Sequence, residues 1–312
     1  MGSTGDAAAG RVPSLTLGAA GARIPALGFG VGTAWYGSGP DPKLVLAIIS
    51  ALDAGFRHID DAETYANMLA TGEAIRTWLA RNPAASRHDL FVTNKVSQST
   101  CAPGGIVAAC SRSLAETGLD YFDAYLMHGP AEFSGRPFPT SLAQLWREME
   151  EVQQLGLARS IGVSNFRISD LAALEADGPL KVPVVINQIE AHPLLQQPQL
   201  EAYCAERHIL IIGYASLAPL VHPPAGGLGN LGEALARVAA AHGRTPAQVL
   251  LRWAAQQGRG LVSTSSKPER LAAFMSIFEF ELSTAEVFEL SEAGAGLPPM
   301  RHFWKALEPD AA

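Results

Sequence analysis

The sequence of 312 residues predicts a (β/α)8 TIM barrel, in which eight parallel strands close into a ring inside a layer of helices. About eight short apolar runs alternate with helical patterns along the chain. Several of these runs are continuous, as expected for parallel strands covered on both faces. No change in composition marks a second domain. We therefore expect a loose tail over residues 1–13 and a single barrel domain over residues 14–312.

The chain begins with a pattern typical of a β-hairpin. Short apolar pieces are interrupted by Gly18, Gly21 and Pro25, and the first barrel strand is expected at residues 26–29. The segment 28–32 could be a dinucleotide-binding loop of a doubly wound fold, but its spacing is GxGxG rather than GxGxxG, and no helix follows directly. Glycines that let the strand end lie close to a ligand or to neighbouring backbone are the preferred interpretation.

Strand and helix signals alternate through the first half. Asp41 and Pro42 are typical of an N-cap and a first helical residue, and Gly55 ends that helix. Ser141 and Gln144 match a capping box at a later helix start. The expected strands lie at residues 56–60, 90–95, 121–128 and 159–164, and the next helices at residues 72–80, 105–117 and 141–155.

The second half keeps this alternation and adds an extra C-terminal helix. A long irregular loop is expected after residue 214. Thr245 and Ser283 are typical N-caps, the latter with Glu286 at capping-box spacing. The helix 284–292 and the tail 297–312 are expected to lie against the barrel. The expected strands lie at 184–190, 209–214 and 261–265, and the other helices at 168–176, 197–207, 231–241, 246–257 and from Pro268 onward.

Charge and composition exclude several classes of protein. The 23 Lys and Arg against 30 Asp and Glu give a net charge of -7, which argues against broad binding to nucleic acid or to an anionic membrane. Residues 208–232 carry no Asp, Glu, Lys or Arg, but prolines and glycines interrupt them too often for a membrane helix. The N-terminus lacks the pattern of a secretory signal. The three cysteines show no disulfide or metal spacing, so we expect unpaired thiols in a soluble, cytoplasmic protein.

Four residues at consecutive strand ends could carry chemistry. Asp60, Lys95 and His128 end the second, third and fourth barrel strands, and Tyr65 lies in the loop after Asp60. Taken singly, each is more typical of a structural residue: a satisfied carboxylate, a packed phenol, a solvated lysine or a core histidine. Because function in this fold lies at the C-terminal strand ends, their joint occurrence favours an active site.

The residue types are suited to proton donation. A tyrosine has a pKa of about 10 and needs a neighbouring cation that favours phenolate if it is to protonate an alkoxide near neutral pH. Lys95 could be that cation, Asp60 its partner, and His128 a hydrogen-bond donor to a carbonyl oxygen. A hydride donor would then fit between Ser164-Asn165, Gln188, the ring of Tyr214 and an anion site at residues 264–270.

Over about residues 15–305 the chain resembles the aldo-keto reductases. The resemblance is carried by residues 55–60 (GFRHID) with Tyr65, 94–95 (NK), 123–128 (DAYLMH), 161–166 (IGVSNF), 187–190 (NQIE) and 265–270 (SSKPER). It implies that Asp60, Tyr65, Lys95 and His128 form the catalytic tetrad, with Tyr65 as general acid, and that no metal is needed.

The same resemblance implies NADPH as the cofactor. Ser164, Asn165 and Gln188 would hold the nicotinamide carboxamide, and Tyr214 would stack on its ring. Ser265 and Arg270 would bind the 2′-phosphate of the adenosine. The full set of expected cofactor contacts is Ser164, Asn165, Gln188, Tyr214, Ser216, Leu217, Thr264, Ser265, Ser266, Lys267 and Arg270.

Within the family, segments 32–36, 264–267 and 300–304 look most like a fungal branch that reduces α-keto amides and α-keto esters. Trp35, Phe303 and Trp304 are therefore expected in the substrate pocket. Phe303 and Trp304 could equally pack the tail onto the barrel.

Several positions depart from the family pattern. Thr264 stands where a lysine is usual, and Phe274 where an asparagine is usual, so NADH use remains an alternative even with Lys267 as a substitute charge. Met68 replaces a usual glutamate. Gly129 follows His128 where many relatives have tryptophan, which predicts a more open or differently shaped substrate mouth.

The sequence therefore predicts an NADPH-dependent reductase of aldehydes or activated ketones. It would act on a small-molecule carbonyl substrate as a monomer or weak homodimer, without nucleic-acid or membrane partners. A cofactor-binding regulatory subunit is the alternative. A metal-dependent hydrolase is disfavoured, because no cluster of histidines and carboxylates with ligand spacing follows successive strands.

Overall fold

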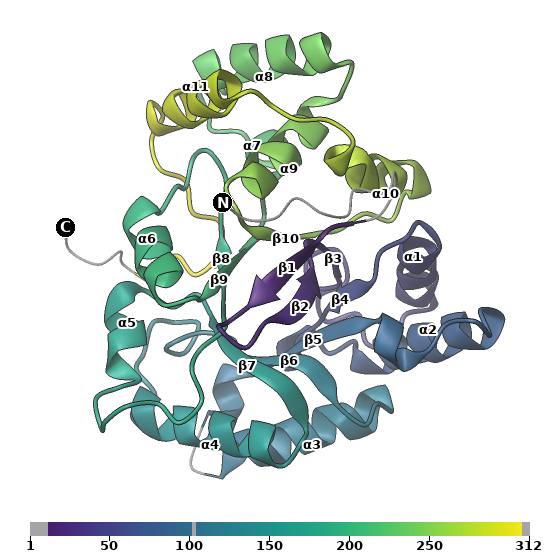
Figure 1. The fold of residues 1–312 in the computed structure, drawn as a ribbon, viewed down its shortest axis with the longest axis vertical. Helices are drawn as coiled ribbons and strands as arrows, with labels where there is room; N and C mark the ends of the chain where they lie inside the picture. Colours follow the sequence, from purple (N-terminus) through teal and green to yellow (C-terminus); the bar gives the residue numbers. More distant parts are fainter. Residues whose placement is uncertain (1–11, 102–103, 308–312) are drawn as a thin grey trace.

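The structure, a computed structural model, describes residues 12–101 and 104–307 and contains a closed parallel barrel inside a layer of helices (Figure 1). Each strand pairs with the next along the chain, and the last closes onto the first, which confirms the predicted fold. The barrel strands are β3 (Leu27–Gly30), β4 (His58–Asp60), β5 (Phe91–Val96), β6 (Phe122–Met127), β7 (Ala158–Ser164), β8 (Ile186–Glu190), β9 (Leu210–Tyr214) and β10 (Gly260–Ser263).

The helices follow the strands in the predicted order. The side chain of Asp41 caps the first by accepting a hydrogen bond of 2.8 Å from the Lys43 amide. The helices are α1 (Pro42–Asp53), α2 (Met68–Arg81), α3 (Gly105–Thr117), α4 (Leu142–Gln154), α5 (Ile168–Ala173), α6 (Pro198–Glu206), α7 (Ala218–Val221), α8 (Gly229–His242), α9 (Pro246–Gln256), α10 (Pro268–Met275) and α11 (Thr284–Ala295).

Several helix boundaries differ from the prediction, and the largest shift of a helix start is at α2. Helix α2 begins at Met68, four residues before the predicted start at Gly72. Gly72 is buried inside the helix, and a Cβ there would lie 2.0 Å from the Thr117 carbonyl oxygen. The glycine therefore permits close packing of α2 on α3 rather than marking a boundary. Helix α7 forms inside the loop that was predicted to be irregular.

The N-terminal hairpin closes one end of the barrel. Strands β1 (Ser14–Leu17) and β2 (Ala22–Pro25) pair antiparallel, as predicted, and in Figure 1 they cross the barrel end that faces the viewer. Leu17 and Ile24 pack against interior residues that include Phe91, Ile186 and Val262. Because this end is covered, a site within the barrel has to open at the opposite end, where the strands terminate.

The C-terminal segment returns across the barrel. Ser283 and Glu286 form the predicted capping box of α11. After this helix, the Met300 amide donates to the Leu194 carbonyl at 2.9 Å, which holds the tail beside the loop that follows β8. Part of the expected C-terminal tail, residues 308–312, and most of the expected N-terminal tail, residues 1–11, lie outside the described residues.

None of the helices in the described ranges is long and apolar enough to cross a membrane. Cys101, Cys110 and Cys204 are free and buried, as expected for structural thiols. Burial raises the pKa of the first two thiols to about 12. These cysteines are therefore protonated and unreactive near neutral pH.

Candidate active site

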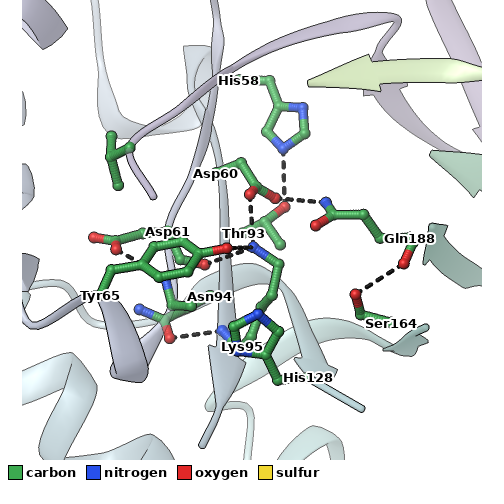
Figure 2. Close-up of polar contacts among 12 residues, drawn as sticks. His58, Asp60, Asp61, Tyr65, Thr93, Asn94, Lys95, His128, Ser164 and Gln188 are labelled. Atoms are coloured by element: carbon green, nitrogen blue, oxygen red, sulfur yellow. Dashed lines mark hydrogen bonds and ion pairs between the residues drawn. The ribbon is translucent and has the colours of Figure 1, made fainter. Parts of the chain in front are cut away.

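The four candidate catalytic residues meet at the open end of the barrel (Figure 2). Asp60 ends β4, Lys95 lies near the end of β5, and His128 directly follows β6. Tyr65 ends a short 3-10 helix, η1 (Glu63–Tyr65), that follows β4. The register of the parallel strands brings these side chains together although they span 68 positions of the chain (60 to 128).

Lys95 is fully buried and forms the centre of the group. Its ammonium Nζ lies 2.6 Å from Asp60 Oδ1, donates to the Asp61 carbonyl at 3.0 Å and reaches the Tyr65 hydroxyl at 3.5 Å. Burial alone would lower the pKa of Lys95, but the attraction of Asp60, Tyr65 and Asp61 raises it above its ordinary value. Lys95 is therefore a cation at neutral pH, as the sequence predicted.

The surroundings of Tyr65 differ in one respect from the expectation. Lys95 favours the phenolate, as predicted, but burial has the larger effect and raises the pKa of Tyr65 above its usual value of 10. Tyr65 is thus a protonated phenol throughout the neutral range. Its ring lies against Gly32, where a Cβ would approach the ring to 2.6 Å. One member of the GxGxG segment therefore makes room for Tyr65.

His128 is neutral. Burial, followed by the positive charge of Lys95, holds its pKa well below the usual 6.5. Its ring stands edge-on to Tyr65 at a centroid distance of 5.5 Å, and its Nδ1 atom lies 3.2 Å from the Thr64 hydroxyl. The sequence did not single out Thr64, because nothing in its local pattern indicates a partner 64 positions away.

The turn that carries Tyr65 is held by Glu63. Its carboxylate accepts from the Ser97 amide at 2.7 Å and from the Thr100 hydroxyl at 3.0 Å. Ala66 then takes a left-handed conformation at φ 56°. This short helix is therefore fixed between the ends of β4 and β5, which positions the tyrosine against Lys95.

A second network joins the amide and hydroxyl groups expected to hold a carboxamide. Asn165 has φ 63°, and its Nδ2 atom donates to the His128 carbonyl at 3.0 Å and to Ser164 Oγ at 2.9 Å. Tyr214 donates to Asn165 Oδ1 at 2.6 Å. Gln188 donates to Asp60 Oδ2 at 2.7 Å, so the two networks share one carboxylate.

The expected anion site, residues 264–270, lies between the end of β10 and the first turn of α10. Ser265 accepts from the Lys267 amide at 3.1 Å, and the side chains of Lys267 and Arg270 are exposed with no ion-pair partner among residues 12–101 and 104–307. The hydroxyls of Ser216 and Thr264 are buried without a hydrogen-bond partner in the described chain. Such atoms need a partner, and a bound nucleotide would supply one. The donor set thus fits a nicotinamide dinucleotide.

Three further residues lie in or near this segment. Ser266 is exposed beside Lys267, and Leu217 is half-buried at the start of α7. Phe274, found where an asparagine was expected, is only 4% exposed and packs in the hydrophobic core. Phe274 therefore makes a packing contact at a position where the family pattern has a polar side chain.

Aromatic side chains of the tail cover the site. Trp304 lies with its ring centroid 6.0 Å from that of His128 and 5.2 Å from that of Phe133. A Cβ at Gly129 would come within 2.1 Å of the Trp304 ring. The space beside Gly129 is therefore filled by the tail, which gives a differently shaped mouth rather than an open one. Phe303 packs edge-on against Tyr214 at 5.7 Å.

Trp35, which was expected in the substrate pocket, packs on the first barrel strand. It is 7% exposed and packs against Phe29 at a centroid distance of 6.0 Å. The next residue, Tyr36, is 65% exposed, and its ring lies 6.1 Å from that of Tyr65. Tyr36 is thus closer to the open side of the site, although the sequence had pointed to Trp35.

Glu190 anchors the tail. Its buried carboxylate accepts from the His302 and Phe303 amides, each at 2.9 Å, and lies 3.2 Å from His192 Nε2. Glu190, His192 and His302 also bring potential metal ligands within 4.8 Å of one another. Sequence spacing did not reveal this group, because His302 is 112 positions from Glu190. The amides donate to both carboxylate oxygens, so Glu190 ties the tail at His302 and Phe303 to the end of β8.

Asp61, next to the site, governs a pH-dependent part of the stability. We expect Asp61→Asn to raise the free energy of unfolding by about 2 kcal/mol at about pH 7.5. Burial raises the pKa of Asp61 from 3.8 to about 6, against the hydrogen bonds from Thr71 and the Ala62 amide. A raised folded-state pKa means that the contribution of Asp61 is fully present below pH 3.8 and is lost as the pH rises through about 6.

Urea unfolding of both proteins at about pH 7.5 and about pH 4.5 measures this effect, and the gain should shrink to less than half at the lower pH. Burial also lowers the pKa of His58 to about 4, with the opposite pH dependence, but His58 is present in both proteins and cancels. Asp120→Asn, at an exposed position, is the matched control. A gain from Asp61→Asn of equal size at both pH values would contradict the assignment.

Comparison with known proteins agrees with this geometry. The profile described as "Aldo/keto reductase family" matches residues 26–295. An NADPH-dependent codeinone reductase of Papaver somniferum is 34% identical over 291 residues, which cover 90% of this chain and 89% of that protein. An aldo-keto reductase of Mycolicibacterium vanbaalenii is 36% identical over 278 residues, 88% of this chain and 89% of that protein.

Solved structures of aldo-keto reductases are also similar to this chain. The crystal structure of a Bombyx mori aldo-keto reductase in complex with NADP superimposes with a TM-score of 0.81 at 31% identity, covering 91% of this chain and 93% of that one. An aldo/keto reductase from Brucella melitensis gives a TM-score of 0.76 at 32% identity, with 90% and 99% covered.

Proposed function

Because this chain belongs to the aldo/keto reductase family, and is therefore an oxidoreductase acting on small carbonyl compounds, we propose that it reduces aldehydes or activated ketones with NADPH. Activated ketones here means α-keto esters and α-keto amides. The observation that carries the proposal is the contact of one buried cation, Lys95, with both a carboxylate and a phenol at the open end of the barrel.

The chemistry follows from this contact. Bound NADPH would supply a hydride to the carbonyl carbon. Tyr65, held protonated by burial, donates its hydroxyl proton to the carbonyl oxygen, so that the product is the neutral alcohol. Lys95 at 3.5 Å stabilises the negative charge left on the tyrosine oxygen. Asp60 at 2.6 Å keeps the buried Lys95 charged.

His128 completes the proposed site by orienting the substrate. It is neutral, so one ring nitrogen carries a proton and can donate a hydrogen bond to the carbonyl oxygen. This bond strengthens as negative charge develops on the oxygen, which favours the transition state over the bound ketone.

Residues at the start of α10 support NADPH as the cofactor. Curated relatives are described as NADPH-dependent, and a similar structure contains NADP. In this chain, Ser265, Lys267 and Arg270 offer a hydroxyl and two exposed cations at the start of α10, where an adenosine 2′-phosphate would bind.

Arg270→Ala is expected to raise KM for NADPH about tenfold and to leave KM for NADH within about twofold. The guanidinium would lose its contact with a phosphate that NADH lacks. Steady-state kinetics with both cofactors at a fixed substrate concentration provides the measurement, and Arg147→Ala, an exposed arginine on α4, is the matched control. Equal weakening of the two cofactors would show that Arg270 does not bind the 2′-phosphate.

A panel of aldehydes, α-keto esters and α-keto amides, assayed with NADPH and NADH, tests the proposed function as a whole. We expect turnover with NADPH and the highest kcat/KM on an activated carbonyl. Tight NADPH binding without turnover of any compound would instead favour a cofactor-binding regulatory subunit.

A further inference from the structure

We propose that Thr64 is a positioning residue that fixes the tautomer of His128 by donating its hydroxyl proton to Nδ1, so that Nε2 carries the proton offered to the substrate. The inference rests on the proposed function, because it concerns the hydrogen bond from His128 to the carbonyl oxygen. It assigns a task to a side chain that the reaction itself does not require.

The hydrogen bond between Thr64 and His128 joins two side chains that have no other hydrogen-bond partner among the described residues. Thr64 Oγ1 lies 3.2 Å from His128 Nδ1. Within residues 12–101 and 104–307, this is the only hydrogen bond of either side chain. In the part of the chain that the structure describes, the Nε2 atom of His128 has no hydrogen-bond partner and is not enclosed, so it is accessible to a ligand. Figure 2 shows the His128 ring beside Tyr65 and Lys95, where a carbonyl oxygen would have to lie.

The direction of the bond follows from proton counting. A neutral imidazole has one N–H and one lone pair, and a hydroxyl can either donate or accept. If Thr64 accepted from Nδ1–H, Nε2 would present a lone pair to the lone pairs of the carbonyl oxygen, which is repulsive. If Thr64 donates, Nδ1 is satisfied and Nε2–H points to the substrate. Only the second arrangement satisfies all three groups.

Thr64 also lies in the same turn as Tyr65. The turn η1 is held by Glu63, so Thr64 and Tyr65 are placed by one rigid element. The contact with His128 therefore links the proposed hydrogen-bond donor to the proposed proton donor. This arrangement keeps both groups directed at the same oxygen.

The test compares Thr64→Val, which removes the hydroxyl at nearly constant shape, with Thr64→Ser, which keeps it. Long-range 1H–15N correlation spectra of histidine-labelled enzyme saturated with NADP+ report the tautomer, with His128→Gln used to assign the signal. We expect the Nε2–H form in the wild type and in Thr64→Ser. In Thr64→Val we expect a mixture with the Nδ1–H form.

Kinetics give the second readout. In Thr64→Val, kcat should fall about fivefold to tenfold, while the dissociation constant for NADPH and the thermal midpoint stay unchanged. Thr64→Ser should recover kcat to within about twofold of the wild type. An unchanged tautomer and kcat in Thr64→Val, or a failure of serine to restore them, would overturn the inference.

His128→Gln separates this inference from the proposed function. If that variant turns over as fast as the wild type, His128 does not act on the carbonyl, and the proposed function of His128 fails together with the role of Thr64. If His128→Gln is slow and Thr64→Val is not, the role of Thr64 alone is wrong.

Discussion

Tyr65→Phe is expected to lower kcat about 1,000-fold while NADPH binding remains within about twofold of the wild type. The substitution removes the hydroxyl that donates the proton in the proposed reaction. It keeps the ring that packs against Gly32 and His128. Single-turnover and steady-state rates give kcat, and fluorescence titration gives NADPH affinity. Stability should change by only about 1 kcal/mol, because the lost contact to Lys95 is long, at 3.5 Å.

The matched control is Tyr36→Phe. Tyr36 is 65% exposed and its ring lies 6.1 Å from that of Tyr65, so the control removes a nearby hydroxyl outside the proposed proton path. It should keep kcat within about twofold. Near-normal turnover of Tyr65→Phe would refute Tyr65 as the proton donor, and equal losses in both variants would point to a general effect on the site.

Lys95→Met is expected to impair both stability and turnover. The variant leaves the carboxylate of Asp60, which is 3% exposed, with Gln188 as its remaining side-chain partner among the described residues. An unpaired buried charge costs about 3 to 5 kcal/mol, so the free energy of unfolding should fall by that amount. Without the cation, charge on the Tyr65 oxygen is no longer stabilised, and kcat should fall at least about 100-fold. Urea unfolding and steady-state kinetics measure the two effects.

The double variant Asp60→Asn/Lys95→Met distinguishes the two effects. With the carboxylate replaced by a neutral amide, most of the lost stability should return, since no unpaired charge remains. Turnover should stay low, because the phenol still lacks its cation. If the double variant were as unstable as Lys95→Met, packing of the lysine stem rather than charge pairing would explain the loss.

How far the sequence predicts the site depends on the kind of contact. Asp60, Lys95 and His128 could be assigned because each ends a strand, and parallel strands of one barrel end at the same side. The contacts of Thr64 with His128, of Glu190 with His302, and of Trp304 with Gly129 carried no such signal. They join a loop or a tail to a strand end, and no repeating pattern fixes where a loop lies.

The direction in which the pKa of Tyr65 shifts could not be predicted from the sequence either. Local reasoning placed Lys95 beside the phenol and gave the correct direction of its influence. It could not weigh that influence against burial, which raises the pKa of Tyr65 more than Lys95 lowers it. Burial is a property of everything packed around a group, so it follows from the assembled barrel rather than from any motif.

The sequence by itself determined the barrel, the order of its strands and helices, and the set of polar residues at the strand ends, because periodicity and capping are encoded within a few neighbouring positions. The tertiary structure alone decided that Glu63 holds the turn of Tyr65 and that Thr64 in this turn contacts His128. It also decided that Glu190 binds the backbone of the tail at Phe303, next to Trp304. These contacts join residues about 30 to 110 positions apart. The physical reason is that a single hydrogen bond or ring contact needs no periodic pattern, only two groups that the closed barrel brings to the same place.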